Sequence, residues 1–196
     1  MSKLSDNLKK IKKKHWFVLF GLISFIVLWS ILLSFIGPNE IIEMLGVKQS
    51  YLAMFLIAVF GGVSTFTSVS YITALLTFAI GGLNPLLLGL IAGTGLTISD
   101  SLFFYLGING KRVLAGRAKK TADKFEGWIK EKPFWFAPLI TYIYISILPL
   151  PNDILTLSMA FSGVKYKTII LSLWLGNITG TFVVAYLASV GISLLM

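Results

Sequence analysis

The sequence lacks cysteine entirely, has a single histidine, and carries charge on only 13% of its 196 residues. The absence of cysteine excludes a disulfide framework, thiol chemistry and cysteine-ligated zinc, and one histidine is too few for most histidine-based metal sites. We therefore expect no metal, no cofactor and no catalytic residue set. The apolar fraction of 56% exceeds the roughly 45–50% of a soluble domain, whose charged fraction is about 25%. This composition excludes a disordered chain and disfavours a soluble one, and the length predicts one domain.

The first apolar run follows a basic tail. Six lysines lie within the first 14 residues, and residues 16–36 are then free of charge. About 20 apolar residues span the hydrocarbon core of a bilayer. The run is longer than the core of a signal peptide, and it is not followed by a small-residue cleavage site. We expect a tail over 1–15 and a retained first transmembrane helix over 16–36.

The second apolar run, 51–83, is broken near its middle by glycine and hydroxyl residues, namely Gly61, Gly62, Ser64, Thr67, Ser68 and Ser70. Its 33 residues are too few for two spans of about 20 and too many for one. We expect a re-entrant helical hairpin that enters and leaves on the same side. Its turn requires surrounding protein or a water-filled cavity.

The run 134–163 is interrupted by Pro149 and Pro151 and predicts a second re-entrant hairpin. The unbroken runs 84–107 and 168–196 predict two further transmembrane helices. We thus expect an all-α integral membrane protein with three transmembrane helices and two hairpins.

The segment 111–132 is basic, and its apolar residues recur every three or four positions. This spacing predicts an amphipathic helix lying on the cytoplasmic face of the membrane. A solvated linker helix is the alternative.

The basic residues support this topology. If both hairpins re-enter, the tail, the segment 108–132, Lys165 and Lys167 share one side and hold 16 of the 17 basic residues, with Lys48 opposite. Short loops rich in Lys and Arg stay in the cytoplasm. We expect the N-terminus to be cytoplasmic and the C-terminus outside, in a prokaryotic plasma membrane.

An internal repeat relates the two halves. A shift of 81 residues superposes Gly82 on Gly163 and Gly95 on Gly176, and it brings the two breaks into register. Each unit is a hairpin followed by a span, and the two units have opposite orientations. Inverted repeats with discontinuous helices are typical of many secondary transporters.

Two runs carry a family likeness: GLNPLLLGLIAGTGLTISDSLFFYLG and LPLPNDILTLSMAFSGVKYKTIILSLWLGNITG. Over residues 50–192 the chain resembles the DedA/VTT superfamily, which includes the SNARE-associated Golgi protein type. Its Pro-x-Pro-Asn-Asp motif is closer to the YqaA-like branch. The resemblance implies a membrane protein that moves lipids or lipid phosphates between leaflets, often with proton coupling. The chain departs from many members in having no acid in 59–83 and no Lys or Arg in 134–163.

Asp100 and Asp153 are the only acids in the predicted hydrocarbon region, where ionisable residues are costly and mark functional sites by default. We assign the substrate or ion pathway to both, together with Asn152, Ser64, Thr67, Ser68 and Ser70. Gly61, Gly62, Pro149 and Pro151 are expected to form the hairpin turns. Structural alternatives remain: Asp153 as a helix N-cap, Asp100 as a hydrogen-bonding residue, and the hydroxyls as partners of freed backbone groups.

These residues favour a transporter, flippase or scramblase of a lipid or amphipathic anionic substrate, coupled to protons through the two Asp residues. Half-helix N-termini would hold the anion. A membrane scaffold or assembly factor is the alternative. An intramembrane aspartyl protease is disfavoured because neither Tyr-Asp nor Gly-x-Gly-Asp occurs. The expected partners are membrane lipids, with anionic headgroups at the basic face, and a second copy of the chain is left open. Nucleic acid is not expected.

Overall fold

A computed structural model describes residues 38–61, 68–111, 116–148 and 152–193. Within these ranges every element is a helix, which confirms the all-helical prediction there. The elements are α2 (Pro38–Leu45), α3 (Val47–Gly61), α4 (Ser68–Ile80), α5 (Pro85–Lys111), α6 (Gly116–Lys130), α7 (Phe136–Ile147), α8 (Asn152–Phe161) and α9 (Tyr166–Ser193). The predicted tail and first transmembrane helix lie outside the described residues, as do Gly62, Ser64, Thr67, Pro149 and Pro151.

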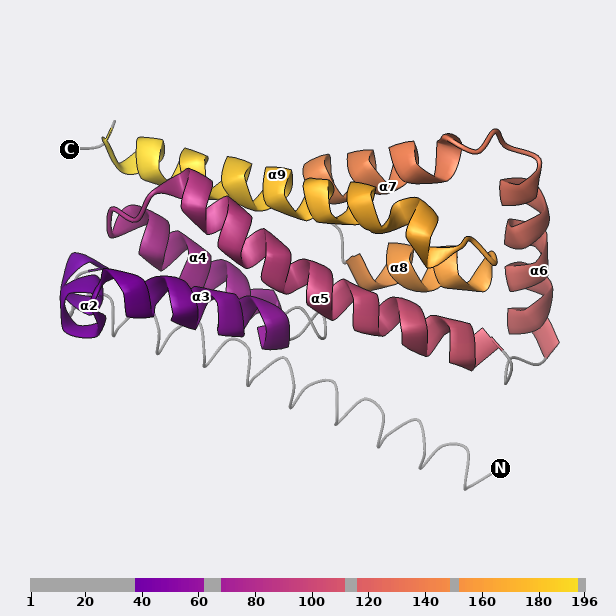
Figure 1. The fold of residues 1–196 in the computed structure, drawn as a ribbon, viewed down its shortest axis with the longest axis horizontal. Helices are drawn as coiled ribbons and strands as arrows, with labels where there is room; N and C mark the ends of the chain where they lie inside the picture. The colour runs from indigo at the N-terminus through magenta and orange to yellow at the C-terminus, as the bar shows by residue number, and fades with distance from the viewer. Residues whose placement is uncertain (1–37, 62–67, 112–115, 149–151, 194–196) are drawn as a thin grey trace, which may run out of the picture.

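Two long apolar helices, α5 and α9, form the centre of the molecule and run in opposite directions (Figure 1). Pro85–Gly110 and Tyr166–Gly191 are each 26 residues long and apolar enough to cross a membrane. At about 1.5 Å per residue each is longer than the hydrocarbon core, which is about 30 Å thick. The start of α5 is fixed by Asn84, whose Oδ1 accepts the Leu86 amide at 2.9 Å, with Pro85 as first helical residue.

Glycine brings the two long helices into close contact. A Cβ added to Gly93 of α5 would lie 2.7 Å from the Cα and the N of Ile178 in α9. A Cβ on Gly89 would lie 2.8 Å from the Cβ of Phe182. Because backbone cannot move aside as a side chain can, a larger residue at Gly93 would force the helices apart.

Two pairs of shorter helices pack against this centre. In Figure 1, α3 and α4 lie towards one end of the long axis, and α7 and α8 lie towards the other. The first residues of α4 and α8 both lie near the middle of that axis. The predicted breaks thus separate α3 from α4 and α7 from α8.

Positions 81 residues apart have similar surroundings. Gly82 and Gly163 both have positive φ, of 91° and 71°, and both end a helix with the same pair of backbone hydrogen bonds. Gly95 of α5 packs on Ala58 of α3, and Gly176 of α9 packs on Ile145 of α7. Each long helix therefore meets the first helix of a pair through an equivalent glycine.

Helix α2 was not foreseen from the sequence. It joins α3 at Gly46, where φ is +84° and the chain bends by 101°. Helix α3 consequently begins at Val47, four residues before the predicted hairpin, and α5 runs four residues past its predicted end at Gly107. Helix α6 runs across the opposite end of the molecule from α2 (Figure 1).

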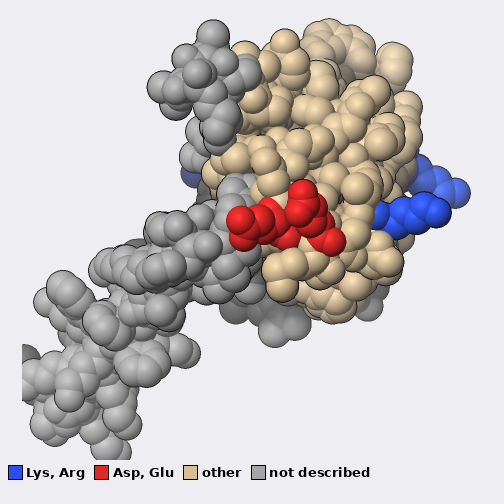
Figure 2. Space-filling model, turned by 90° about the vertical axis from the view of Figure 1, so that its left-hand side faces the viewer, with Lys and Arg blue, Asp and Glu red and all other residues tan. Residues whose placement is uncertain are grey.

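Charge is confined to the two ends of the described structure, apart from Asp100 and Asp153. Figure 2 shows the end at which α2 lies, where acidic side chains gather; Glu40 and Glu43 of α2 are both exposed. The opposite end is basic, with exposed Lys120, Lys124, Lys130, Lys165 and Lys167.

Between the ends, large apolar side chains face outwards, among them Leu52, Phe60, Leu86, Leu102, Leu171 and Leu187. Soluble monomers rarely expose apolar surface on this scale. This band of exposed apolar side chains is the kind of surface that contacts lipid in a membrane protein.

Candidate functional site

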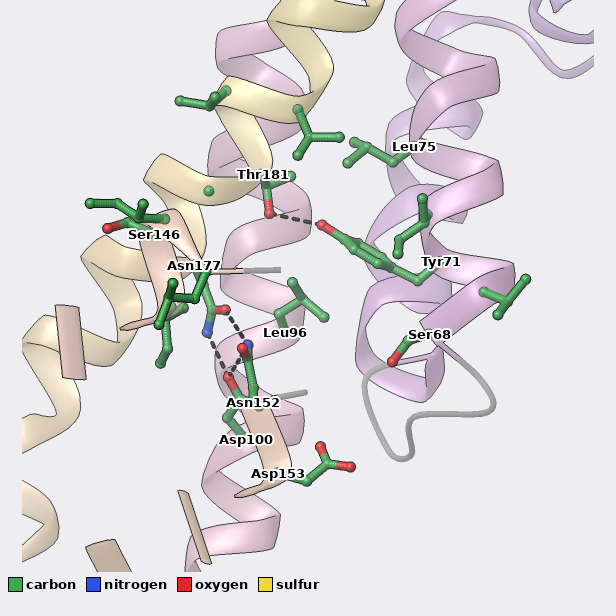
Figure 3. Close-up of a pocket in the computed structure, with 18 residues that line it drawn as sticks. Ser68, Tyr71, Leu75, Leu96, Asp100, Ser146, Asn152, Asp153, Asn177 and Thr181 are labelled. Carbon is green, nitrogen blue, oxygen red and sulfur yellow. Dashed lines mark hydrogen bonds between the residues drawn. The ribbon is translucent and has the colours of Figure 1, made fainter. Parts of the chain in front are cut away.

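A cavity of about 450 Å³ lies among α4, α5, α7, α8 and α9. Its lining includes the start of α4, the end of α7 and the start of α8, so both breaks border it. Figure 3 shows its polar side chains, which come from all five of these helices. The cavity therefore lies beside helix ends that flank both predicted breaks.

Asp100 forms the centre of a polar cluster on one wall. Its side chain is 1% exposed, and its Oδ2 accepts hydrogen bonds from the Nδ2 of Asn177 at 2.8 Å and the Nδ2 of Asn152 at 3.2 Å. Asn152 also donates to the Oδ1 of Asn177 at 3.0 Å. The Nδ2 of Asn177 further donates to the Thr97 hydroxyl at 3.1 Å. This cluster of four residues joins α5, α8 and α9, and Figure 3 shows three of them, Asp100, Asn152 and Asn177.

The cluster satisfies a buried carboxyl with neutral donors alone. Burying an ionised group without hydrogen bonds is very costly, and amide donors reduce that cost without cancelling the charge. The structural alternative foreseen for Asp100, a hydrogen bond to the other half of the chain, is thus present. It coexists with a position on the cavity wall.

A second polar contact crosses the cavity from α4. The Tyr71 and Thr181 hydroxyls are 2.8 Å apart, and both residues are buried. Thr181 lies one turn beyond Asn177 on α9, so the two side chains share a helix face. Helix α9 is thereby linked to α8 through Asn177 and to α4 through Thr181.

Asp153 also lines the cavity, next to Asn152 in the first turn of α8. In Figure 3 its carboxyl extends away from the Asp100 cluster, towards the side where Ser68 lies. Because α8 begins at Asn152, Asp153 is the second helical residue rather than the residue that precedes the helix. An acid in the first turn interacts favourably with the positive end of the helix dipole.

The other predicted site residues divide into three groups. Ser68 lines the cavity. Ser70 lies two residues further along α4, outside the described lining, and Gly61 is the last residue of α3. Ser64, Thr67, Gly62, Pro149 and Pro151 lie outside the described residues. The structure thus brings Asp100, Asn152, Asp153 and Ser68 to one cavity.

Sequence reasoning missed several polar residues of this site, among them Asn177, Thr97, Tyr71 and Thr181. Asn177 could have been found, because an amide in the middle of the unbroken apolar run 168–196 needs a polar partner. Tyr71 and Thr181 gave no such signal, since single hydroxyls are common in membrane helices and bond to their own backbone.

Within the described ranges, no group of three or more His, Asp or Glu side chains could hold a metal ion. No protein-family model, curated protein or solved structure matches this chain. The site is therefore interpreted from its own geometry.

Proposed function

We propose that the protein is a small membrane transporter, flippase or scramblase that moves a lipid or another amphipathic substrate through the cavity. The observation that carries this proposal is the cavity itself, which lies midway along two helices long enough to cross a bilayer. A cavity lined by two acids at that depth has no role in anchoring a chain, whereas transporters bind substrate near the bilayer midplane.

We propose that α3–α4 and α7–α8 are re-entrant hairpins of an inverted repeat. The matched turns at Gly82 and Gly163 support this arrangement, as do the matched contacts of Gly95 and Gly176. Each hairpin borders the cavity at its break. Movement of one unit against the other would open the cavity to alternate sides of the membrane.

The charge distribution supports an orientation. The end with α6 and the start of α9 is basic, and the end with α2 carries exposed acids. Since basic loops stay in the cytoplasm, we propose that α6 lies at the cytoplasmic face and that α9 ends outside.

The family proposal rests on the same residues. The two runs that resemble the DedA/VTT superfamily contain Thr97, Asp100, Asn152 and Asn177, all four members of the polar cluster. We propose that the chain is a divergent relative of the YqaA-like branch. Its two cavity acids would then carry the proton coupling that the resemblance implies.

The direct test is leaflet exchange of a fluorescent phospholipid in proteoliposomes, with and without a pH gradient. We expect exchange above that of protein-free vesicles, slowed at least tenfold by Asp100→Asn or Asp153→Asn. Asp123→Asn, a change at an exposed acid of α6, is the matched control and should exchange at the native rate. An inactive native protein would exclude the lipid version of the proposal.

A scaffold or assembly factor is the second candidate, and α6 favours it. This helix lies across the basic end and exposes Lys120 and Lys124. Replacing Lys119, Lys120 and Lys124 with glutamine should abolish a scaffold role. The same change should spare intrinsic transport, so the exchange assay separates the two candidates.

A further inference from the structure

The headgroup that this cavity accepts follows from its charge. Asp100 and Asp153 both line it, and the described lining contains neither Lys nor Arg. The segments 49–110, 133–164 and 168–196, which supply all of this described lining, contain no basic residue. The helices around the cavity carry lysine only at their ends, as Lys111, the last residue of α5, and Lys167, the second residue of α9. The described wall of the cavity is therefore acidic.

The partial positive charge of helix N-termini does not cancel the negative charge of the two acids. The starts of α4 and α8 both face the cavity region, through Ser68 and Asn152. Each helix N-terminus is equivalent to about +0.5 elementary charge. Two of them would offset about half of the charge of two ionised carboxyls, and the one at α8 already has Asp153 in its first turn. The cavity thus disfavours a phosphate or a carboxylate.

The apolar part of the lining points to an amphipathic ligand. The polar residues Asp100, Asn177 and Thr181 are nearly inaccessible to solvent. Apolar lining residues on three helices are exposed instead: Ile72 of α4, Ile147 of α7, and Val183 and Val184 of α9. Asp100 therefore lies deep in the cavity, and the exposed apolar residues form its mouth. A ligand that enters through them buries a hydrocarbon tail while its headgroup reaches the acids.

We propose that the cavity binds an amphipathic amine, with its ammonium group at Asp100 and Asp153 and its alkyl chain along Ile72, Val183 and Val184. The carboxyls supply acceptors and charge, and the Tyr71 and Ser68 hydroxyls supply further acceptors. This inference rests on the proposed function, because it names the substrate class of that same cavity. It replaces the anionic headgroup expected from the sequence with a cationic one.

The test uses three probes with the same eight-carbon chain: octylamine, octyl phosphate and octanol. Each is titrated at pH 7 into the full-length protein in phosphatidylcholine nanodiscs, and the signal of empty nanodiscs is subtracted. We expect saturable binding of octylamine at least tenfold tighter than that of octanol. We expect no binding of octyl phosphate above the empty discs.

Two variants locate the binding. Asp100→Asn and Asp153→Asn should each weaken octylamine binding at least tenfold and leave octanol binding unchanged. Unchanged octanol binding would show that the variant's cavity is intact. Should Asp100→Asn fail to fold, Asp153→Asn decides the matter, because the Asp153 carboxyl extends away from the buried cluster. Asp123→Asn, on α6, is the control and should bind octylamine as the native protein does.

Three results would overturn the proposal: octyl phosphate binding as tight as that of octylamine, octylamine no tighter than octanol, or octylamine binding unaffected by both cavity variants. The proposed transport function is tested separately, by the leaflet-exchange assay. Selective amine binding without leaflet exchange contradicts the lipid version of the transport proposal and leaves the amine site standing. Exchange of a phosphate lipid faster than that of an amine lipid supports transport and overturns the amine headgroup.

Discussion

At the scale of single residues, the site depends on Asn177. Its amide group donates to Asp100 and Thr97 and accepts from Asn152, so one side chain links three helices. Both ends of the amide are used, which fixes its orientation. Removing this side chain would leave the buried Asp100 carboxyl without the shorter of its two amide hydrogen bonds.

We predict that Asn177→Ala destabilises the protein by about 1–3 kcal/mol, the usual cost of leaving a buried polar partner unsatisfied. Asn109→Ala on α5 is the control. Asn109 is exposed and bonds only to the Tyr105 carbonyl of its own helix among the described residues, so a change within about 0.5 kcal/mol is expected. Reversible unfolding in mixed detergent micelles measures both. Equal stability losses in the two variants would show that the cluster does not stabilise the fold.

At the scale of elements, the structure depends on the close approach of α5 and α9. The contact at Gly93 is backbone to backbone, and it sets the distance across which Asn177 reaches Asp100 and Thr97. The distance between the two long helices therefore determines the geometry of the polar cluster.

We predict that Gly93→Ala destabilises the protein by about 1–3 kcal/mol, because the added methyl group forces a backbone shift. Gly191→Ala on α9 is the matched control, since a Cβ there meets nothing within 4 Å. Alanine at that helical position should be neutral or stabilise by up to about 1 kcal/mol. Thermal unfolding in detergent compares the variants; a Gly93→Ala protein as stable as the native one would mean that the helices can separate freely.

At the scale of the whole molecule, an apolar band separates an end that carries Glu40, Glu43 and Lys48 from a strongly basic end. Exposed apolar side chains fill the band, and the charges within it, Asp100 and Asp153, lie at the cavity. Such a surface is stable in lipid and would aggregate in water. The basic end, with α6 lying across it, is the one that anionic lipid of a cytoplasmic leaflet attracts.

The lack of cysteine makes the orientation directly testable, because a single introduced cysteine is the only thiol in the chain. We predict that Glu43→Cys reacts with a membrane-impermeant maleimide added to intact cells. Lys120→Cys should react only after the membrane is permeabilised. Both native side chains are exposed, so burial does not confound the labelling. The reverse pattern would invert the proposed topology.

Much of the fold could be predicted from composition and pattern. Long unbroken apolar runs predicted α5 and α9, and clustered glycine, hydroxyl and proline residues predicted the breaks that separate α3 from α4 and α7 from α8. Helix α2 escaped prediction, because a helix that short depends on a bend at Gly46 and on packing beyond its own sequence. The resemblance to DedA/VTT proteins stays a prediction.

The candidate site was predictable only in part. Asp100, Asn152 and Asp153 were identified from the sequence because polar groups are costly in lipid wherever they lie. Their partners depend on which helix faces meet, so the pairing of Asn177 with Asn152 and of Tyr71 with Thr181 follows only from the packing of α9 against α8 and α4. The sequence by itself determined a helical, membrane-compatible chain with two acids in its apolar part. Tertiary structure alone decided that both acids line one cavity whose described wall holds no basic residue, because charge balance depends on which side chains converge in space.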